Sequence, residues 1–326
     1  MDPLIAVRAI HLAATTLVAG IVFFEWLVAG PGLRGPGELL SPILLRFHAR
    51  TARILWISLG LAVMSGAAWL SLLAADIVDR PLLEVIADGT AWKVFTQTRF
   101  GLDWQMRLLC AVLLGGYVQK SRRTGGFSLL SGLPAAALAA AFIGALAWAG
   151  HGGATPGNTG IIHVSADVLH LVAAGAWLGG LVPLVILLGC VRRSDGERRA
   201  TAAGAICHRF SNLGIFSVGA LLVSGLTNAS FLVGDAQGLT GTSYGRLLML
   251  KLFLFFGMVC VAAVNRQYLL PRLASGVAAP GPDADAQIAR LERNAALEIA
   301  FGIAVLVVVA MLGVAPPATE PHVHIH

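Results

Sequence analysis

The sequence predicts an all-α polytopic membrane protein, with eight transmembrane helices arranged as two parallel four-helix repeats. Three observations lead to this fold class. The composition is 57% hydrophobic and only 12% charged, apolar stretches recur along the whole chain of 326 residues, and the second half repeats features of the first. A soluble domain carries about 25% charged residues, roughly twice as many, so the composition is typical of a protein that lies mostly in a membrane.

Each apolar stretch is long enough to cross a bilayer, which takes about 20 residues in a helix. Backbone polar groups cannot stay unpaired in lipid, and the alternating pattern of a membrane barrel is absent, so each span should be a helix. The first stretch begins MDPLIAVRAIH, without the positive cluster or cleavage site of a signal peptide, and we expect it to be retained. The expected spans are residues 4–29, 52–75, 102–119, 127–149, 161–190, 210–233, 246–270 and 295–315.

The positive charges lie mainly in alternate loops. A net charge of +6 and a pI of about 9.6 would hint at nucleic acid in a soluble chain. Here the basic residues fall between spans, so we expect lipid and no nucleic acid as the surroundings. Lys and Arg mark cytoplasmic loops, which puts both termini in the periplasm. The basic loop residues are Arg34, Arg46, Arg50, Arg53, Lys120, Arg122, Arg123, Arg192, Arg193, Arg198, Arg199, Arg209, Arg266, Arg272, Arg290 and Arg293.

The two halves share three sequence motifs in the same order. IHLAATTLVAG (10–20) matches LHLVAAGAWLG (169–179), and SLGLAVMSG (58–66) matches SVGALLVSG (217–225), both at an offset of 159 residues. TRFGLDWQMRL (98–108) matches TSYGRLLMLKL (242–252) at an offset of 144. An alternative explanation is that Gly and Ser at these spacings only reflect close packing of membrane helices.

Each half contains four expected spans, which is an even number, so both halves enter the membrane from the same side. This indicates a parallel repeat about an axis along the membrane normal. The expected units are a first half (residues 1–150), a second half (151–315) and a periplasmic tail (316–326) that ends in PHVHIH. The tail histidines either capture metal or belong to an end with no role.

Ionisable residues gather in the outer half of the expected bundle. His163, Asp167 and His170 follow one another at spacings of four and three residues, which places them on one face of a helix. His11 should lie at a depth similar to that of His170, and His151 lies where the fourth span leaves the membrane. Ionisable groups within a span usually face the bundle interior and mark a functional path.

These residue types favour a metal or cofactor site. Imidazole suits copper, zinc, iron and nickel, and a carboxylate can complete or orient the ligand shell. The alternative for each histidine is a hydrogen bond to a neighbouring helix. Arg107 and Lys251 occupy equivalent positions in the two halves, and either lock the halves together or contact an anionic group. We expect Asp103, one turn before Arg107, to be the partner of that buried cation.

Several motifs of energy coupling and catalysis are absent from the sequence. There is no Walker motif, no DKTGT-like phosphorylation sequence, no HExxH and no Ser/His/Asp order. We therefore expect neither ATP drive nor an enzyme.

Longer stretches of the chain resemble the copper resistance protein D (CopD) family of bacterial inner-membrane proteins. The resemblance rests on His11 in the first span, HVSADVLHLVAAGAWLGGL, RFSNLGIFSVGALLVSGLTN, LTGTSYGRLLMLKLFLF and NRQYLLP. It implies an eight-helix inner-membrane protein of copper homeostasis that moves copper from periplasm to cytoplasm. It also implies a periplasmic copper-binding partner of the CopC type, which we expect to be a separate chain here.

Three hypotheses follow for the function. In the first, the chain is a copper permease that binds Cu(I) or Cu(II) among His11, His163, Asp167 and His170, with His151 at the entrance. In the second, it is a membrane redox protein that holds haem b, with His11 and His170 as axial ligands from opposite halves. In the third, it is a non-transporting copper sensor or scaffold. The extra pair of His163 and Asp167 favours a metal ion, because haem would not need it.

Overall fold

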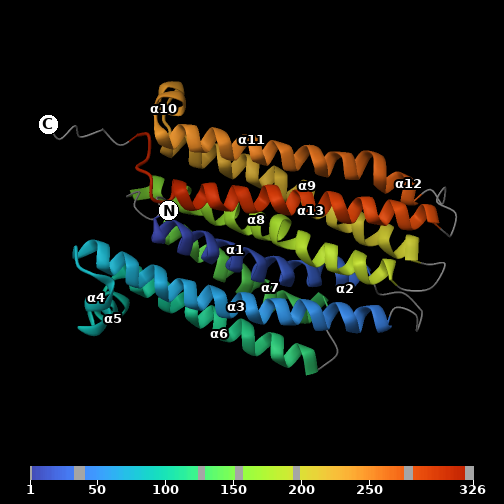
Figure 1. Cartoon of the computed structure of the whole chain (residues 1–326), viewed down its shortest axis with the longest axis horizontal. Coiled ribbons are helices and arrows are strands. Elements are labelled where there is room, and N and C mark those ends of the chain that lie inside the picture. Colours follow the sequence, from blue (N-terminus) through green and yellow to red (C-terminus); the bar gives the residue numbers. More distant parts are fainter. Residues whose placement is uncertain are drawn as a thin grey trace.

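The computed structural model describes residues 2–32, 41–123, 129–150, 157–193, 199–274 and 282–319. These residues form helices and connecting turns, with no strand among them, which confirms the all-α prediction. The long helices run side by side along the molecule (Figure 1). They are α1 (Pro3–Phe24), α3 (Ser41–Ile77), α6 (Arg99–Arg123), α7 (Leu129–Gly144), α8 (Gly157–Arg192), α9 (Arg199–Leu232), α11 (Ser243–Val264) and α13 (Pro282–Leu312).

Shorter helical segments extend or connect the long ones. The π-helix η1 (Glu25–Ala29) and α2 (Gly30–Gly32) continue α1, and the 3₁₀-helix η3 (Ala145–Ala149) continues α7. The π-helix η5 (Asn265–Leu269) and α12 (Leu270–Ala274) continue α11. Three short helices lie in the connections between long helices, namely α4 (Leu82–Ala87), α5 (Thr90–Gln97) and α10 (Ala236–Gly241).

Seven helices of the described part of the chain are long and apolar enough to cross a membrane. They are Pro3–Ala29, Leu45–Ile77, Gly132–Ala149, Gly157–Arg192, Thr201–Leu232, Ser243–Leu273 and Asp285–Leu312. Large apolar side chains such as Phe216, Leu226 and Phe253 are more than two-thirds exposed at 78%, 77% and 70%, as lipid-facing residues would be. The chain is therefore a polytopic helical membrane protein.

The expected span at residues 102–119 lies in α6, which is not among these seven helices. At 25 residues α6 is long enough to cross a bilayer. Asp103, Gln105 and Arg107 in its first half lower its apolar character, which explains why composition alone does not select it. The count of eight spans stays a prediction.

The helices α6 and α11 begin with the same cap. The side-chain Oγ1 of Thr98 accepts a hydrogen bond of 2.9 Å from the backbone N–H of Gly101, and Thr242 accepts one of 3.0 Å from Gly245. Such a cap satisfies one of the free N–H groups at a helix start. The matching motifs TRFG and TSYG thus have the same local conformation in both halves.

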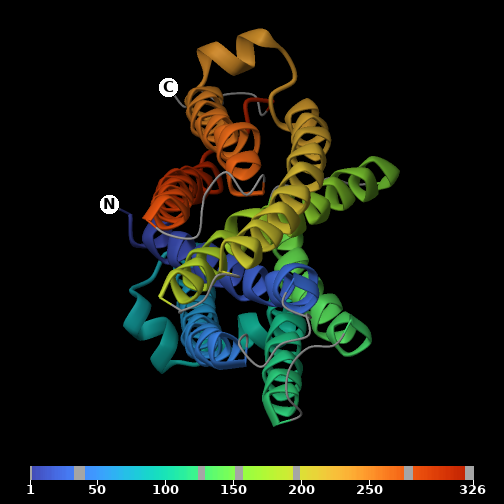
Figure 2. The ribbon, with the colours of Figure 1, turned by 90° about the vertical axis from the view of Figure 1, so that its right-hand side faces the viewer.

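The helices α1 and α8 pack against each other in the middle of the molecule (Figure 2). They touch at Gly20 and Gly179, where a Cβ atom on Gly20 would overlap the backbone of Gly179. A Cβ on Gly179 would in turn overlap the carbonyl of Thr16. Small residues at such a point allow two membrane helices to approach closely and gain van der Waals contact.

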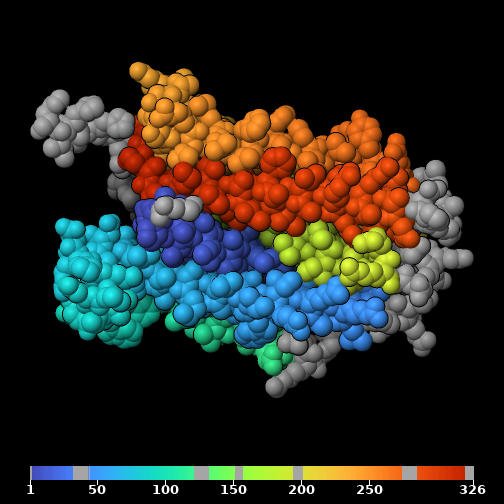
Figure 3. All heavy atoms as spheres, in the orientation of Figure 1, coloured from blue at the N-terminus to red at the C-terminus, as the bar shows by residue number. Residues whose placement is uncertain are grey.

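Apolar side chains form a core on each side of the α1–α8 pair. One core is formed mainly by α1, α3, α6 and α7 and also takes in Ala176 of α8 and Ala310 of α13. The other is formed mainly by α8, α9, α12 and α13 and also takes in Phe24 of α1 and Phe47 of α3. On one face of the molecule α13 packs between α11 and α1 (Figure 3). The division into two four-helix repeats stays a prediction, because each of the two cores contains residues from both halves.

A substitution at the central contact should destabilise the whole bundle. Gly20→Ala forces α1 and α8 apart, and we expect it to lower the free energy of unfolding by about 1–3 kcal/mol, as overpacking does. The matched control is Gly60→Ala in α3, because a Cβ at Gly60 meets no atom within 4 Å. Thermal unfolding of both purified variants in detergent would check this, and equal midpoints would contradict it.

Candidate functional site

His11 on α1 is fully enclosed, with 1% of its surface exposed. Its Nδ1 lies 3.0 Å from the Oγ of Ser65 on α3, and Ser65 donates its proton to the carbonyl of Leu61 at 2.5 Å. Nδ1 is therefore the donor toward Ser65, and the other ring nitrogen, Nε2, accepts from the guanidinium of Arg107 on α6. Both ring nitrogens of His11 are engaged, which leaves no lone pair for a metal ion.

Aromatic rings surround the cations beside His11. The guanidinium carbon of Arg107, a residue that is 1% exposed, lies 4.3 Å from the ring centre of Trp104, and that of Arg8 lies 4.3 Å from Trp69. Such cation–π contacts partly compensate the charge of a buried guanidinium. Among the described residues no ion pair joins Arg107 to Asp103. The direct partner of Arg107 is His11, and the expected Asp103 acts on it only at longer range.

His170 on α8 repeats half of this arrangement. Its Nδ1 lies 3.0 Å from the Oγ of Ser224 on α9, and Ser224 donates to the carbonyl of Ala220 at 2.6 Å. The two serines stand 54 residues after their histidines in both halves. The difference is at Nε2, which in His170 has no hydrogen bond to any described residue. Ser224 therefore fixes the ring while one nitrogen lone pair remains available.

Asp167 lies one turn before His170 on the same face of α8. Its Oδ1 accepts a hydrogen bond of 3.1 Å from the side-chain amide of Asn228 on α9. Its Oδ2 accepts none from the part of the chain that the structure describes. Lys251 on α11 interacts electrostatically with both Asp167 and His170. Asp167 and His170 thus lie one helix turn apart on α8, and each is hydrogen-bonded to a residue of α9.

The other predicted ligands lie differently. His163 is 2% exposed, and its ring stacks on Phe231 of α9 with centres 4.6 Å apart and planes inclined by 10°. His151 lies outside the described residues, as do His322, His324 and His326 of the tail. Gly150, the residue before His151 in the sequence, is close to Asp167, since a Cβ on it would lie 3.7 Å from Oδ2.

The described residues contain no group of three or more His, Cys, Asp or Glu side chains that could hold a metal ion. Asp167 and His170 lie one helix turn apart on α8, and His163 lies one turn before Asp167. His11 has separate partners on α3 and α6. The described residues therefore do not provide the two free Nε2 atoms that axial ligation of one haem by His11 and His170 needs.

Both histidines bond to a serine 54 residues later, but their other neighbours differ. At the offset of 159 residues, Arg8 corresponds to Asp167 and Trp69 corresponds to Asn228. Arg8 and Trp69 make a cation–π contact, whereas Asp167 and Asn228 make a hydrogen bond. The surroundings of His11 are thus aromatic and cationic, and those of His170 are polar and include a carboxylate.

Some residues of this site were not predicted from the sequence. The serines appear there as markers of the repeat and not as partners of the histidines. The sequence did contain a signal for these serines, since SLGLAVMSG and SVGALLVSG both end in Ser-Gly at the offset that relates the two histidines. Asn228, Arg8 and Trp69 gave no sequence signal, because their role depends on which faces of neighbouring helices meet.

The fold and these residues define a polytopic helical membrane protein with ionisable groups inside its spans, and comparison with known proteins identifies its family. Residues 1–161 match the family model described as copper resistance protein D-like, N-terminal domain, and residues 204–312 match copper resistance protein D. The chain belongs to the copper resistance protein D family. No solved structure matches it.

Three relatives cover most of the chain. Inner membrane protein YebZ of Escherichia coli K12 is 31% identical over 96% of this chain and 98% of its own length. Copper resistance protein D of Pseudomonas syringae pv. tomato is 31% identical over 79% of this chain and 84% of its own. Copper transport protein CutJ of Bacillus subtilis 168 is 29% identical over 96% of this chain, which spans 53% of CutJ. The chain is therefore a multi-pass inner-membrane protein with a copper-related function.

The different neighbours of the two histidines predict different effects on stability. His11→Ala removes the hydrogen-bond partner of a buried guanidinium, and we expect a loss of about 1.5–3 kcal/mol in the free energy of unfolding. His170→Ala should cost less, because Ser224 keeps its bond to Ala220 and no buried charge loses its partner. Thermal unfolding in detergent measures both. Adding Arg107→Leu to His11→Ala should restore part of the loss, and no recovery would contradict this reason.

Proposed function

We propose that the chain transports copper ions across the inner membrane, and that Asp167 and His170 form the centre of its binding site. The observation that carries this proposal is the free Nε2 of His170, held in place by Ser224 and one helix turn from the carboxylate of Asp167. The family membership and the similarity to the copper transport protein CutJ support copper as the cargo.

The hydrogen bonds around His170 prepare it for a metal ion. A histidine ligand usually donates its second ring N–H to a neighbouring acceptor, which fixes the tautomer and orients the ring. Ser224 is such an acceptor, and Asn228 anchors the carboxylate in a similar way. Imidazole with carboxylate suits Cu(II), and imidazole also binds Cu(I).

Lys251 gives this site a means of release. Its ammonium is the cation that acts on Asp167 when no metal is present. A copper ion that enters must replace this ammonium as the electrostatic partner of Asp167. We expect the exchange to keep copper binding weak enough for the ion to move on.

The remaining predicted ligands take different roles in this proposal. His163 and His151 lie before Asp167 along the chain and serve the entrance, where a CopC-type periplasmic protein would deliver copper. His11 is structural, because both of its ring nitrogens are already engaged. The alternative function, a non-transporting copper sensor or scaffold, predicts a different result. The purified protein would bind copper, but vesicles that contain it would take up none.

The direction and the architecture of transport are part of the same proposal. We propose eight spans, including α6, in two parallel repeats with both termini in the periplasm. Copper would pass from periplasm to cytoplasm as the two halves move about the contact of α1 and α8, as parallel repeats do in other transporters. In this proposal the chain is a transporter and not an enzyme.

The two serines offer a matched test of this site. Ser224→Ala frees the ring of His170, and we expect copper affinity to fall roughly 10–100-fold, as loss of a supporting hydrogen bond does at metal sites. Ser65→Ala removes the same group beside His11 and should leave copper affinity unchanged. Titration of the purified variants with copper measures both. Equal losses in the two variants would contradict the assignment of the site to His170.

Direct removal of the ligands tests transport. His170→Ala and Asp167→Asn should abolish copper uptake into proteoliposomes while the protein still inserts and keeps its helical content. Leu226→Ala on α9, at a side chain that is 77% exposed, is the control for a neutral change nearby. Normal uptake by the double variant of His170 and Asp167 would remove this mechanism.

A further inference from the structure

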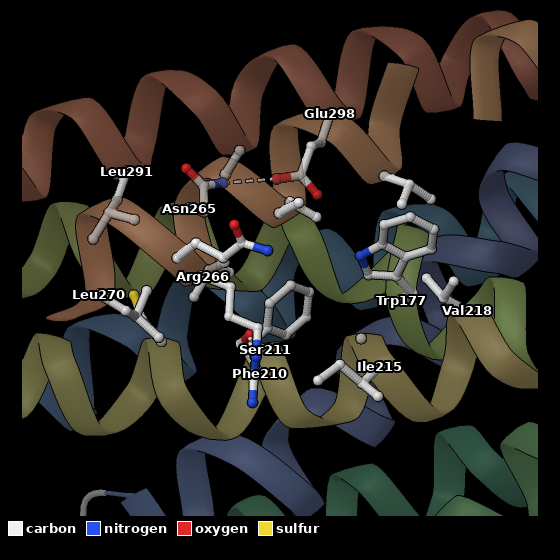
Figure 4. Close-up of a pocket in the computed structure, with 18 of the residues that line it drawn as sticks. Trp177, Phe210, Ser211, Ile215, Val218, Asn265, Arg266, Leu270, Leu291 and Glu298 are labelled. Atoms are coloured by element: carbon white, nitrogen blue, oxygen red, sulfur yellow. Dashed lines mark hydrogen bonds between the residues drawn. The ribbon is translucent and has the colours of Figure 1, made fainter. Parts of the chain in front are cut away.

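A second polar group lies in the half that contains His170, farther along the bundle toward α12. Glu298 on α13 is 3% exposed and lines a cavity of about 250 Å³ between α8, α9, α11 with η5, and α13 (Figure 4). The proposed copper site contributes no residue to this cavity. Its walls are almost entirely apolar and include the aromatic rings of Trp177 and Phe210.

A short chain of hydrogen bonds holds Glu298 in place. The side-chain amide of Asn294 donates to Oδ1 of Asn265 at 2.7 Å, and the amide of Asn265 donates to Oε1 of Glu298 at 2.9 Å. The other carboxyl oxygen, Oε2, has no hydrogen bond to a described residue and points into the cavity (Figure 4). Because Oε2 faces the cavity without a partner from the described residues, it favours a ligand in the cavity that supplies a donor.

The backbone at this point is also unusual. Asn265 begins the π-helix η5, where the α-helical hydrogen-bond register of α11 slips by one residue. Single π-turns inside long helices occur frequently at functional sites. Here the π-turn directs Asn265 toward Glu298 and Arg266 toward α9. The guanidinium of Arg266 donates to Ser211 at 2.7 Å and to Asn212 at 3.1 Å.

The cavity lies near the surface of the bundle, which would face lipid in the membrane. It separates α9 from α11, and these two helices diverge in the end view (Figure 2). Ile215 of α9 lines the cavity and is 50% exposed on the outer surface of the bundle. A molecule dissolved in the bilayer therefore has a short route between these helices to the carboxyl group.

From this geometry we infer that the cavity binds a membrane-soluble molecule with an apolar body and a hydroxyl group, which donates to Oε2 of Glu298. The body lies between Trp177 and Phe210. Small-molecule sites have this character, with mostly apolar walls and a few polar groups that fix the orientation. A quinol ring and a lipid-derived alcohol both have the required chemistry, and the experiment below distinguishes them.

Binding of three simple probes to the full chain in phosphatidylcholine nanodiscs tests this inference, with isothermal titration calorimetry as the measurement. 4-Hexylphenol has the hydroxyl group, and 4-hexylanisole is the same molecule with the hydroxyl methylated. We expect the phenol to bind roughly tenfold or more tightly than the anisole, because only the phenol donates to the carboxyl oxygen. Equal affinities, or no binding of the phenol, would overturn the inference.

The third probe, 1-decanol, identifies the source of the ligand. Binding of the phenol without the alcohol supports a ring such as a quinol. Binding of both supports any apolar molecule with a hydroxyl group, including a lipid-derived alcohol. Binding of the alcohol alone would overturn the placement of a ring between Trp177 and Phe210.

Two variants and one control locate the binding. In Glu298→Gln the preference for the phenol should disappear, because a glutamine amide can donate to either probe. Gly214→Val fills the cavity beside Trp177, where a Cβ would lie 3.6 Å from the indole nitrogen, and should abolish binding of both probes.

The control is Glu25→Gln. Glu25 is also buried and accepts a hydrogen bond of 2.7 Å from the hydroxyl of Thr51, but it does not line the cavity. An unchanged preference in Glu298→Gln, or its loss in Glu25→Gln, would overturn the assignment.

Discussion

The close approach of α1 and α8 at Gly20 and Gly179 is the contact on which the rest of the structure depends. In lipid there is no hydrophobic force between helices, so close packing and hydrogen bonds must hold them together. The glycine pair lets the two backbones touch. Each helix then packs most of its remaining surface against different neighbours, α3 and α7 for α1 and α9 for α8, while α13 contacts both. The two histidines, nine residues before the glycines, therefore bond to different partner helices.

Both halves contain a histidine that is hydrogen-bonded to a serine and has a cation nearby, but the second ring nitrogen of the histidine differs between the halves. In the first half the chain from Arg107 through His11 to Ser65 and the carbonyl of Leu61 uses both nitrogens of the ring. In the second half the chain from His170 through Ser224 ends at Ala220, and one nitrogen remains. Because their neighbours differ, His11 has both ring nitrogens hydrogen-bonded, whereas His170 keeps one nitrogen that can bind a ligand. Two equivalent positions in a repeat need not have equivalent functions.

The sequence predicted the helical class and the seven apolar spans because each is encoded locally, by a run of apolar residues that lipid requires to be a helix. It also placed Asp167 and His170 on one face, because helical periodicity fixes neighbours along a chain. It did not predict the partners across helices. Spacing pointed to Asp103 for Arg107, but the rotation of α6 against α1 presents His11 instead. The cavity beside Glu298 had no sequence signal, because it arises from how α9 and α11 diverge.

The polar groups within the spans fall into two kinds, and the difference follows from the cost of burial. A polar group in a membrane bundle is tolerated when its hydrogen bonds are complete, as those of the His11 ring are, and then it stabilises the packing. Where one atom is left without a partner among the described residues, as at Nε2 of His170 and Oε2 of Glu298, a ligand can complete the hydrogen bonds. Intramembrane ionisable groups with such an open atom are therefore stronger candidates for function than those that are fully satisfied. By this criterion both halves carry candidates, because Nε and Nη1 of Arg107 and Oδ2 of Asp103 are also buried without a hydrogen bond to a described residue.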